Sequence, residues 1–317
     1  MSADGHDQLF WSKELGKYVI ITRGYREGLR TVLALTGTEK LRSIKDVWKA
    51  TRDRAKEEAL VRAGEYFTEP EIVLTGDKEA QPYSMPVLRL SEGYYAGVLS
   101  VANFDTGSAG AYRVNASLTW SRDGEHWRYM ADGAPFIDNA PAFVLEKGND
   151  YGMIYCAAPV VTNTEIQIFY AAIPELHYFN YEQIPEKMKK TLARKIPRAM
   201  AAKVVTRSTA LNVATLSKDR YAGYFAEEGS VATAPLSLMG DTVRITADVT
   251  KEGSLTAALL DEQGRAIEGF GYEDFHTLTQ SVTDAPLTWT KDTGCLVGRR
   301  VSLVLRLKQA TVYTVSM

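Results

Sequence analysis

The segment SLTWSRDGEHWRYM, residues 117–130, holds a strand, a tight turn and a tryptophan in close succession. Leu118–Ser121 is typical of a strand end, and Asp123-Gly124 supplies the positive φ that a two-residue hairpin turn requires. A plain hairpin is one interpretation of this pattern. The other is the closing turn of a repeated multi-strand unit, in which Asp123 bonds the turn backbone and Trp127 fills the gap between strands. The rest of the chain decides between the two.

Composition excludes several classes of protein. The chain has 317 residues, of which 45% are hydrophobic and 24% charged, and a formal net charge of -2. That balance gives no electrostatic reason to bind nucleic acid or a membrane surface, and no apolar run is long enough to span a bilayer. The four histidines follow no metal-binding spacing, so we expect neither a metal nor another cofactor. Cys156 and Cys295 are expected to be buried free thiols.

Strand signals dominate the first two thirds of the chain. Strands are expected over 9–24 and 30–37, then as a series over 83–133, and as a third group from 151 to about 229. Each group has three or four short strands that end in polar turns, which indicates repeated units rather than one sheet. Helical insertions are expected near 43–64 and 182–203, the second of which is basic and is either a solvated surface helix or a docking surface.

The pattern changes at about residue 230. From there apolar and polar residues alternate around Gly and Asp turns, which predicts a compact antiparallel β-sandwich. The chain is therefore expected to be all-β, with one domain over 1–229 and a second over 230–317.

Several segments carry a resemblance to a known family. They are GSLTAALLDEQGRAIEGFGYEDF (253–275), GRRVSLVLRLKQATVYTVSM (298–317), ADGHDQLFWSKELGKYVIITR (3–23), SLTWSRDGEHW (117–127) and NDYGMIYCAAPVVTNTEIQIFYAAIPELHY (149–178). In their order along the chain, these segments resemble bacterial glycosidases of the five-bladed β-propeller superfamily, which includes invertase-like and arabinanase-like glycoside hydrolases. The resemblance implies a propeller followed by a C-terminal β-sandwich, with SRDGEHW as a structural turn at the end of a blade.

The resemblance has one clear departure. The family propeller has five blades, whereas this sequence shows about three and enters a strand soon after residue 1. We therefore expect an N-terminally incomplete propeller. Either the chain is a truncated form, or a second copy or another chain pairs with the open edges in an oligomer.

The resemblance also implies catalytic residues. Glycoside hydrolysis needs one carboxylic acid to protonate the leaving oxygen and a second carboxylate as nucleophile or base. Asp4 and Asp150 match aspartates of the family, and Glu165 is a candidate proton donor if burial raises its pKa. Each has a plainer alternative, since Asp4 and Asp150 are also suited to turns and Glu165 to a strand start.

Candidate substrate-binding residues come from the same matches. His6 adjoins Asp4, and Tyr83 matches a family segment that lines the funnel. His177 matches the terminal histidine of a family segment and is suited to a hydrogen bond with a sugar hydroxyl. Arg23 and Arg207 are suited to binding a carboxylate, sulfate or hydroxyl through the planar guanidinium fork. Structural salt bridges and aromatic packing are the alternatives for these residues.

The sequence thus predicts a glycoside hydrolase-like protein that acts on an oligo- or polysaccharide. The alternative is a non-catalytic glycan-binding or assembly protein with the same fold, because fold alone does not fix function. The resemblance implies a secreted or periplasmic bacterial protein. The chain shows no signal peptide, which leaves a cytoplasmic location open.

Overall fold

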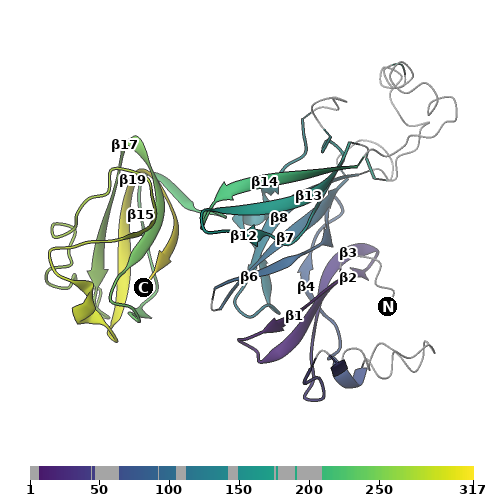
Figure 1. The fold of residues 1–317 in the computed structure, drawn as a ribbon, viewed down its shortest axis with the longest axis horizontal. Helices are drawn as coiled ribbons and strands as arrows, with labels where there is room; N and C mark the ends of the chain where they lie inside the picture. The colour runs from purple at the N-terminus through teal and green to yellow at the C-terminus, as the bar shows by residue number, and fades with distance from the viewer. Residues whose placement is uncertain are drawn as a thin grey trace. The chain divides into compact units, whose positions relative to one another are not determined.

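The computed structural model describes residues 7–43, 45–46, 64–91, 93–104, 112–141, 149–174, 176–177, 190 and 209–317. In this part of the chain the protein is all-β (Figure 1). It forms two compact units, Met1–Val160 with Gln167–Ala214, and Val161–Ile166 with Thr215–Met317. The helical insertions expected near 43–64 and 182–203 lie almost entirely outside the described residues. No described helix has the length and apolarity that a membrane crossing needs.

The first unit begins with a four-stranded antiparallel sheet. Its strands, in both chain and spatial order, are β1 (Gln8–Ser12), β2 (Lys17–Arg26), β3 (Leu29–Thr36) and β4 (Glu71–Thr75). The tight connections follow from residues that accept positive φ, Gly16 between β1 and β2 and Glu27-Gly28 between β2 and β3. This arrangement matches the strands expected over 9–24 and 30–37. The strand β4 was not anticipated.

A second sheet has ten strands. They are β5 (Ala80–Ser84), β6 (Val87–Ser91), β7 (Tyr94–Asn103), β8 (Arg113–Ser121), β9 (Trp127–Tyr129), β10 (Pro135–Ile137), β11 (Met153–Cys156), β12 (Val160–Val161), β13 (Glu165–Ile173) and β14 (Ala210–Ser217). The two ends of β7 pair with β5 and β6, and β8 pairs with β9 and β10 on its other side. The two halves of the sheet meet where β11 pairs parallel to β8. Neither sheet of this unit closes on itself among the described strands.

A hydrophobic core joins the two sheets of the first unit. Its buried residues are Val19, Ile21, Val32, Ala34 and Leu74 from the first sheet, and Met85, Val87, Tyr95, Leu99, Val101 and Trp127 from the second. Trp127 is 6% exposed, and its indole nitrogen donates to the carbonyl of Gly124 at 2.9 Å. The sheets therefore pack face to face, and the tryptophan of the 117–130 segment belongs to that core.

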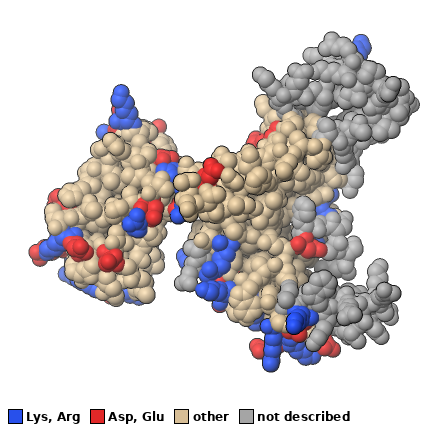
Figure 2. Space-filling view, in the orientation of Figure 1, with Lys and Arg blue, Asp and Glu red and all other residues tan. Residues whose placement is uncertain are grey.

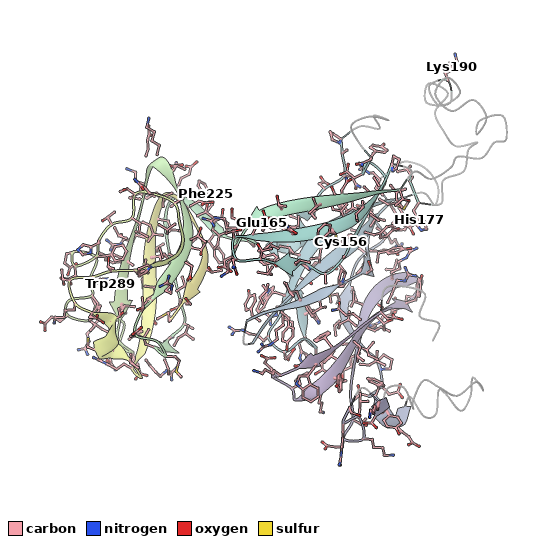
Figure 3. All side chains as sticks on the ribbon, viewed as in Figure 1. Cys156, Glu165, His177, Lys190, Phe225 and Trp289 are labelled. Atoms are coloured by element: carbon pink, nitrogen blue, oxygen red, sulfur yellow. The ribbon has the colours of Figure 1, made fainter. Side chains whose placement is uncertain are left out.

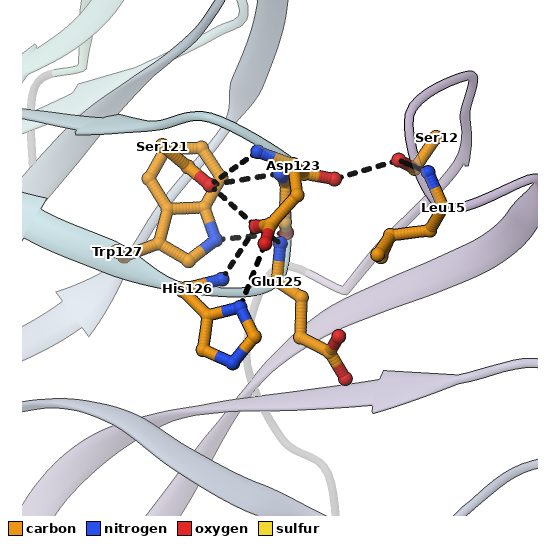
Figure 4. Close-up of polar contacts among 8 residues, drawn as sticks. Ser12, Leu15, Ser121, Asp123, Glu125, His126 and Trp127 are labelled. Carbon is orange, nitrogen blue, oxygen red and sulfur yellow. Dashed lines mark hydrogen bonds and ion pairs between the residues drawn. The ribbon is translucent and has the colours of Figure 1, made fainter. Parts of the chain in front are cut away.

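The turn between β8 and β9 is a hydrogen-bonded loop (Figure 4). The Oδ1 atom of Asp123 accepts from the backbone N–H groups of Glu125 and His126 at 2.9 and 2.8 Å, and Ser121 Oγ accepts from Gly124 N at 2.8 Å. The expectation that Asp123 bonds the turn backbone is confirmed. The prediction of a two-residue turn is wrong, because Ser121 pairs with Trp127 and five residues lie between them.

The same turn is tied to the first sheet. The hydroxyl of Ser12 donates to the carbonyl of Asp123 at 2.6 Å and accepts from Leu15 N at 3.1 Å. A β-carbon on Gly124, whose φ is +83°, would lie 2.7 Å from the Phe10 ring. The turn thus needs glycine for its backbone conformation and for its close approach to β1.

The second unit is built around two long strands. They are β17 (Arg244–Leu260) and β19 (Arg300–Ser316), which pair antiparallel with a register shift between Val249 and Ser254. The other strands of this sheet are β15 (Tyr224–Ala232), β16 (Leu236–Ser237) and β18 (Val282–Pro286). Its core contains Leu255, Leu303, Phe270 and Trp289, so this unit has apolar packing of its own.

The cysteine expectations are met only in part. Both thiols are free, and Cys156 is buried in β11, where burial raises its pKa to about 12. Cys295 is exposed, contrary to the expectation, because it lies in a short 3-10 turn that buries Thr293 and Leu296 instead.

Candidate functional site: an arginine–tyrosine cluster

Two adjacent strands place two arginines on one face of the first sheet. In the ladder of β2 and β3, Arg23 lies opposite Val32 and Arg30 lies opposite Tyr25. Side chains two residues apart on a strand share a face, so Arg23 and Arg30 are diagonal neighbours. Val32 belongs to the core between the sheets, which shows that this face is directed toward the second sheet. Arg23 is 7% exposed.

A β-bulge directs Tyr83 toward these arginines. The pairing of β5 with β7 runs from Pro82 opposite Val101 to Ser84 opposite Ser100, so Tyr83 is the extra residue on β5. Bulges of this kind change the direction of a side chain and are common near functional sites. The centre of the Tyr83 ring lies 4.5 Å from the Arg23 guanidinium carbon and 5.5 Å from that of Arg30, within cation–π range.

Tyr112 and His177 close the other side of the group. Their rings stack with centroids 4.5 Å apart, and the backbone N–H of His177 donates to the carbonyl of Tyr112 at 2.9 Å. The Nε2 atom of His177 lies 3.4 Å from the hydroxyl of Tyr83. Tyr155 on β11 adds a third tyrosine, with its ring centroid 5.4 Å from that of Tyr83. Figure 3 labels His177 and Cys156 in this unit.

We call Arg23, Arg30, Tyr83, Tyr112, Tyr155 and His177 the arginine–tyrosine cluster. They come from widely separated segments of the sequence and meet within the first unit. Three of them, Arg23, Tyr83 and His177, are residues that the sequence marks as substrate-binding candidates. The structure therefore brings together every candidate of that group that lies within the described residues.

The electrostatics of the cluster are dominated by its cations. Burial raises the pKa of Tyr83, but hydrogen bonds from Arg23 and Tyr155 and the positive charge of Arg23 outweigh burial, so the pKa lies below its ordinary value. Arg30 donates from Nη1 to the Gln81 side-chain oxygen at 3.1 Å and from Nη2 to the Tyr112 hydroxyl at 3.2 Å. The cluster thus combines two fixed positive charges, hydroxyl groups and flat aromatic rings, which suits it to binding a polar ligand of moderate size.

Asp150 lies in a separate polar group. It follows Asn149 in the turn before β11, and its Oδ2 atom accepts from the Tyr170 hydroxyl at 3.0 Å. Asn212 on β14 donates to that hydroxyl at 3.3 Å and exchanges hydrogen bonds with Asn149. Asn139 donates to the backbone carbonyl of Asp150 at 2.9 Å. The carboxylate is therefore oriented by a tyrosine, in a turn whose backbone is fixed.

The remaining candidates are not brought to the cluster. Glu165 is half-buried at the start of β13, where its backbone and Thr162 form a closed turn, and it belongs to the second unit, whereas Asp150 belongs to the first. Neither unit by itself therefore holds both carboxylates. Asp4, His6 and Arg207 lie outside the described residues.

Sequence reasoning missed half of the cluster. Arg30 and Tyr112 stand in segments that are typical of ordinary strands and adjoin no motif, whereas Tyr155 lies in the segment 149–178 that carries the resemblance but was not singled out as a candidate. A signal for Arg30 exists in hindsight, since the hairpin at Glu27-Gly28 fixes the register that places it diagonally from Arg23. No pattern in the sequence indicates the bulge at Tyr83, on which the meeting of these residues depends.

Comparison with known proteins gives little further guidance. No protein-family model matches the chain, and no curated protein matches it. Among solved structures, a chain named "Glycoside hydrolase" aligns over 97% of this chain and 70% of its own length, with a TM-score of 0.31 and 9% sequence identity. A likeness of that size supports no inference about fold or activity, so the functional argument rests on the geometry of the cluster.

Proposed function

We propose that this protein is glycoside hydrolase-like and binds an oligo- or polysaccharide at the arginine–tyrosine cluster. The described sheets of the first unit would be blades of an incomplete five-bladed type of propeller, and the second unit a β-sandwich. The observation that carries the proposal is that Arg23 and His177, both candidate substrate-binding residues, contact Tyr83, a third candidate.

The chemistry of the cluster fits a sugar. A pyranose presents apolar C–H faces, which pack on aromatic rings, and a rim of hydroxyl groups, which need fixed donors and acceptors. Tyr83 and Tyr155 offer ring faces with a hydroxyl at one end, and His177 and Arg23 offer polar groups beside them. Because Arg23 is buried and in contact with Tyr83, little side-chain freedom is lost when it binds a ligand.

Hydrolysis requires carboxylates in addition to this binding surface. We propose Asp150, with Asp4 and Glu165, as the acid and base or nucleophile. In support, the Tyr170 hydroxyl holds Asp150 in one orientation, as expected of a group that must meet a substrate atom.

One observation favours the alternative, a non-catalytic glycan-binding protein. The carboxylate of Asp150 accepts from Tyr170, and no hydrogen bond among the described residues joins it to the cluster. A binding protein would need the cluster alone.

An oligosaccharide panel tests both forms of the proposal. Binding is measured by calorimetry and hydrolysis by release of reducing ends, for the wild type, Tyr83→Ala and Asp150→Asn. The hydrolase form predicts that Tyr83→Ala weakens binding about tenfold or more, whereas Asp150→Asn keeps binding and loses at least about 100-fold in rate. The matched control is Asp132→Asn, an exposed aspartate whose φ of +52° also suits asparagine.

The outcomes separate the two forms. Hydrolysis that survives in Asp150→Asn contradicts the assigned catalytic role. Binding without turnover in the wild type supports the glycan-binding alternative. A wild-type chain that binds none of the sugars contradicts both forms.

A further inference from the structure

No acidic side chain of the described residues balances the charge of Arg30. Its polar partners are the side-chain oxygen of Gln81 and the hydroxyl of Tyr112, both neutral, and no described carboxylate forms an ion pair with it. Its Nε atom is buried and has no hydrogen-bond partner. A buried or half-buried cation is costly without a counter-charge. Arg30 is therefore placed to receive an anion from outside the protein.

A second guanidinium stands beside the first. Arg23 and Arg30 are diagonal neighbours on one face of β2 and β3, and both lie over the ring of Tyr83. A carboxylate bound beside the Tyr83 ring would therefore lie near two positive charges. The lowered pKa of the Tyr83 hydroxyl agrees with a positive local potential.

The shape of the cluster favours one kind of anion. A guanidinium is planar and matches a carboxylate through two parallel hydrogen bonds. The half-buried rings of Tyr83 and Tyr155 lie beside the two arginines, with their centroids 5.4 Å apart, whereas the ring of Tyr112 is fully buried behind them. A free inorganic anion would make no use of those rings.

We infer that the arginine–tyrosine cluster recognises the carboxylate of an acidic sugar, so the ligand is an oligosaccharide that contains a uronic acid. This inference rests on the proposed function and specifies its substrate class. In the complex, Arg30 and Arg23 hold the carboxylate, and the rings of Tyr83 and Tyr155 support the sugar face.

The test compares two ligands that differ in one group. A uronic-acid oligosaccharide and the same oligosaccharide with its carboxylates reduced to primary alcohols are titrated into the full chain by calorimetry. We expect the acid form to bind about tenfold or more tightly than the reduced form, as one lost charge-assisted hydrogen-bond pair would give. Inorganic phosphate and sulfate are titrated as separate ligands.

Three variants locate the effect. Gln81→Glu keeps the acceptor of Arg30 but neutralises its charge from within the protein, so it should remove the preference for the acid form without lowering the melting temperature. Arg30→Gln should also remove the preference. Arg26→Gln is the matched control, because Arg26 lies at the end of the neighbouring strand β2, is exposed and forms an ion pair with Glu27 at 3.9 Å.

The results distinguish this inference from the proposed function. Equal binding of the two oligosaccharides, with Tyr83→Ala weakening both, overturns the inference and leaves the proposed function in place. Failure of both ligands to bind overturns both. Phosphate or sulfate that binds as tightly as the acid oligosaccharide also overturns the inference, since it identifies a simple anion site.

Discussion

At the scale of single residues, Glu14 shows how one carboxylate joins two sheets. It lies in the turn between β1 and β2, and it accepts from Arg89 at 2.8 Å, from the backbone N–H of Gly93 at 2.7 Å and from the Tyr95 hydroxyl. These hydrogen bonds, led by those from Arg89 and Tyr95, lower the pKa of Glu14 to about 2 from an ordinary 4.5. The charged form is thus favoured in the folded state.

This contact predicts a pH-dependent stability. Because the folded-state pKa is depressed, the contribution of Glu14 is complete above about pH 4.5 and is lost as the pH falls through 2. Glu14→Gln should reduce the free energy of unfolding by about 1–2 kcal/mol at pH 7, discounted for its partial exposure. Urea titrations of both proteins at pH 7, 4 and 2 measure this, and a difference that stays constant down to pH 2 would contradict it.

The Tyr83 hydroxyl offers a second check at this scale. If Arg23 holds its pKa below the ordinary 10, then Arg23→Gln should raise that pKa, because the hydrogen bond and the positive charge are both removed. Carbon-13 NMR of tyrosine labelled at Cζ follows the titration directly, and Tyr83→Phe assigns the resonance. An unchanged pKa in Arg23→Gln would show that the two side chains are not in contact.

At the scale of elements, the turn between β8 and β9 fixes the first sheet against the second. Gly124→Ala should destabilise the chain through both its φ of +83° and the 2.7 Å approach of the new methyl group to Phe10. Gly28→Ala is a matched control, since Gly28 has the same φ but nothing within 4 Å. We expect the free energy of unfolding to fall by about 1 kcal/mol in Gly28→Ala and by about 2–4 kcal/mol in Gly124→Ala, as measured by thermal or urea unfolding. Equal losses would mean that the contact with Phe10 contributes nothing.

The strands of both units were largely predictable, because alternation of apolar residues and Gly or Asp turns are local signals. The sequence also identified Asp123 and Trp127 correctly as structural. It missed β4, whose five residues Glu71–Thr75 show no clear alternation. It also could not show the cluster, since a bulge at Tyr83 and the packing of two sheets are set by contacts between distant segments.

At the scale of the whole molecule, β14 is an open edge of the second sheet. Among the described strands it has β13 as its single neighbour. Its Leu211 is 76% exposed and its Val213 is 50% exposed. In the view of Figure 2 the surface over β13 and β14 carries few charged side chains. An apolar edge without charges favours pairing with another chain, so pairing of a second copy along β14 stays a prediction.

This edge predicts the mass of the protein in solution. Light scattering should give at least twice the 35.1 kDa of one chain. Val213→Glu should reduce the mass to that of a monomer, whereas Val297→Glu, at an equally exposed valine of the second unit, should leave it unchanged. A wild-type monomer would contradict pairing through β14.

The most direct test of sugar binding at the arginine–tyrosine cluster is to locate a bound sugar. A crystal structure of the full chain with the tightest-binding oligosaccharide of the panel would show which residues contact it. We expect a sugar ring against Tyr83, with a polar group of the sugar within hydrogen-bond distance of Arg23 or Arg30. A sugar bound elsewhere, for example at Asp150 and Tyr170 or on the second unit, with the arginine–tyrosine cluster unoccupied, would contradict it.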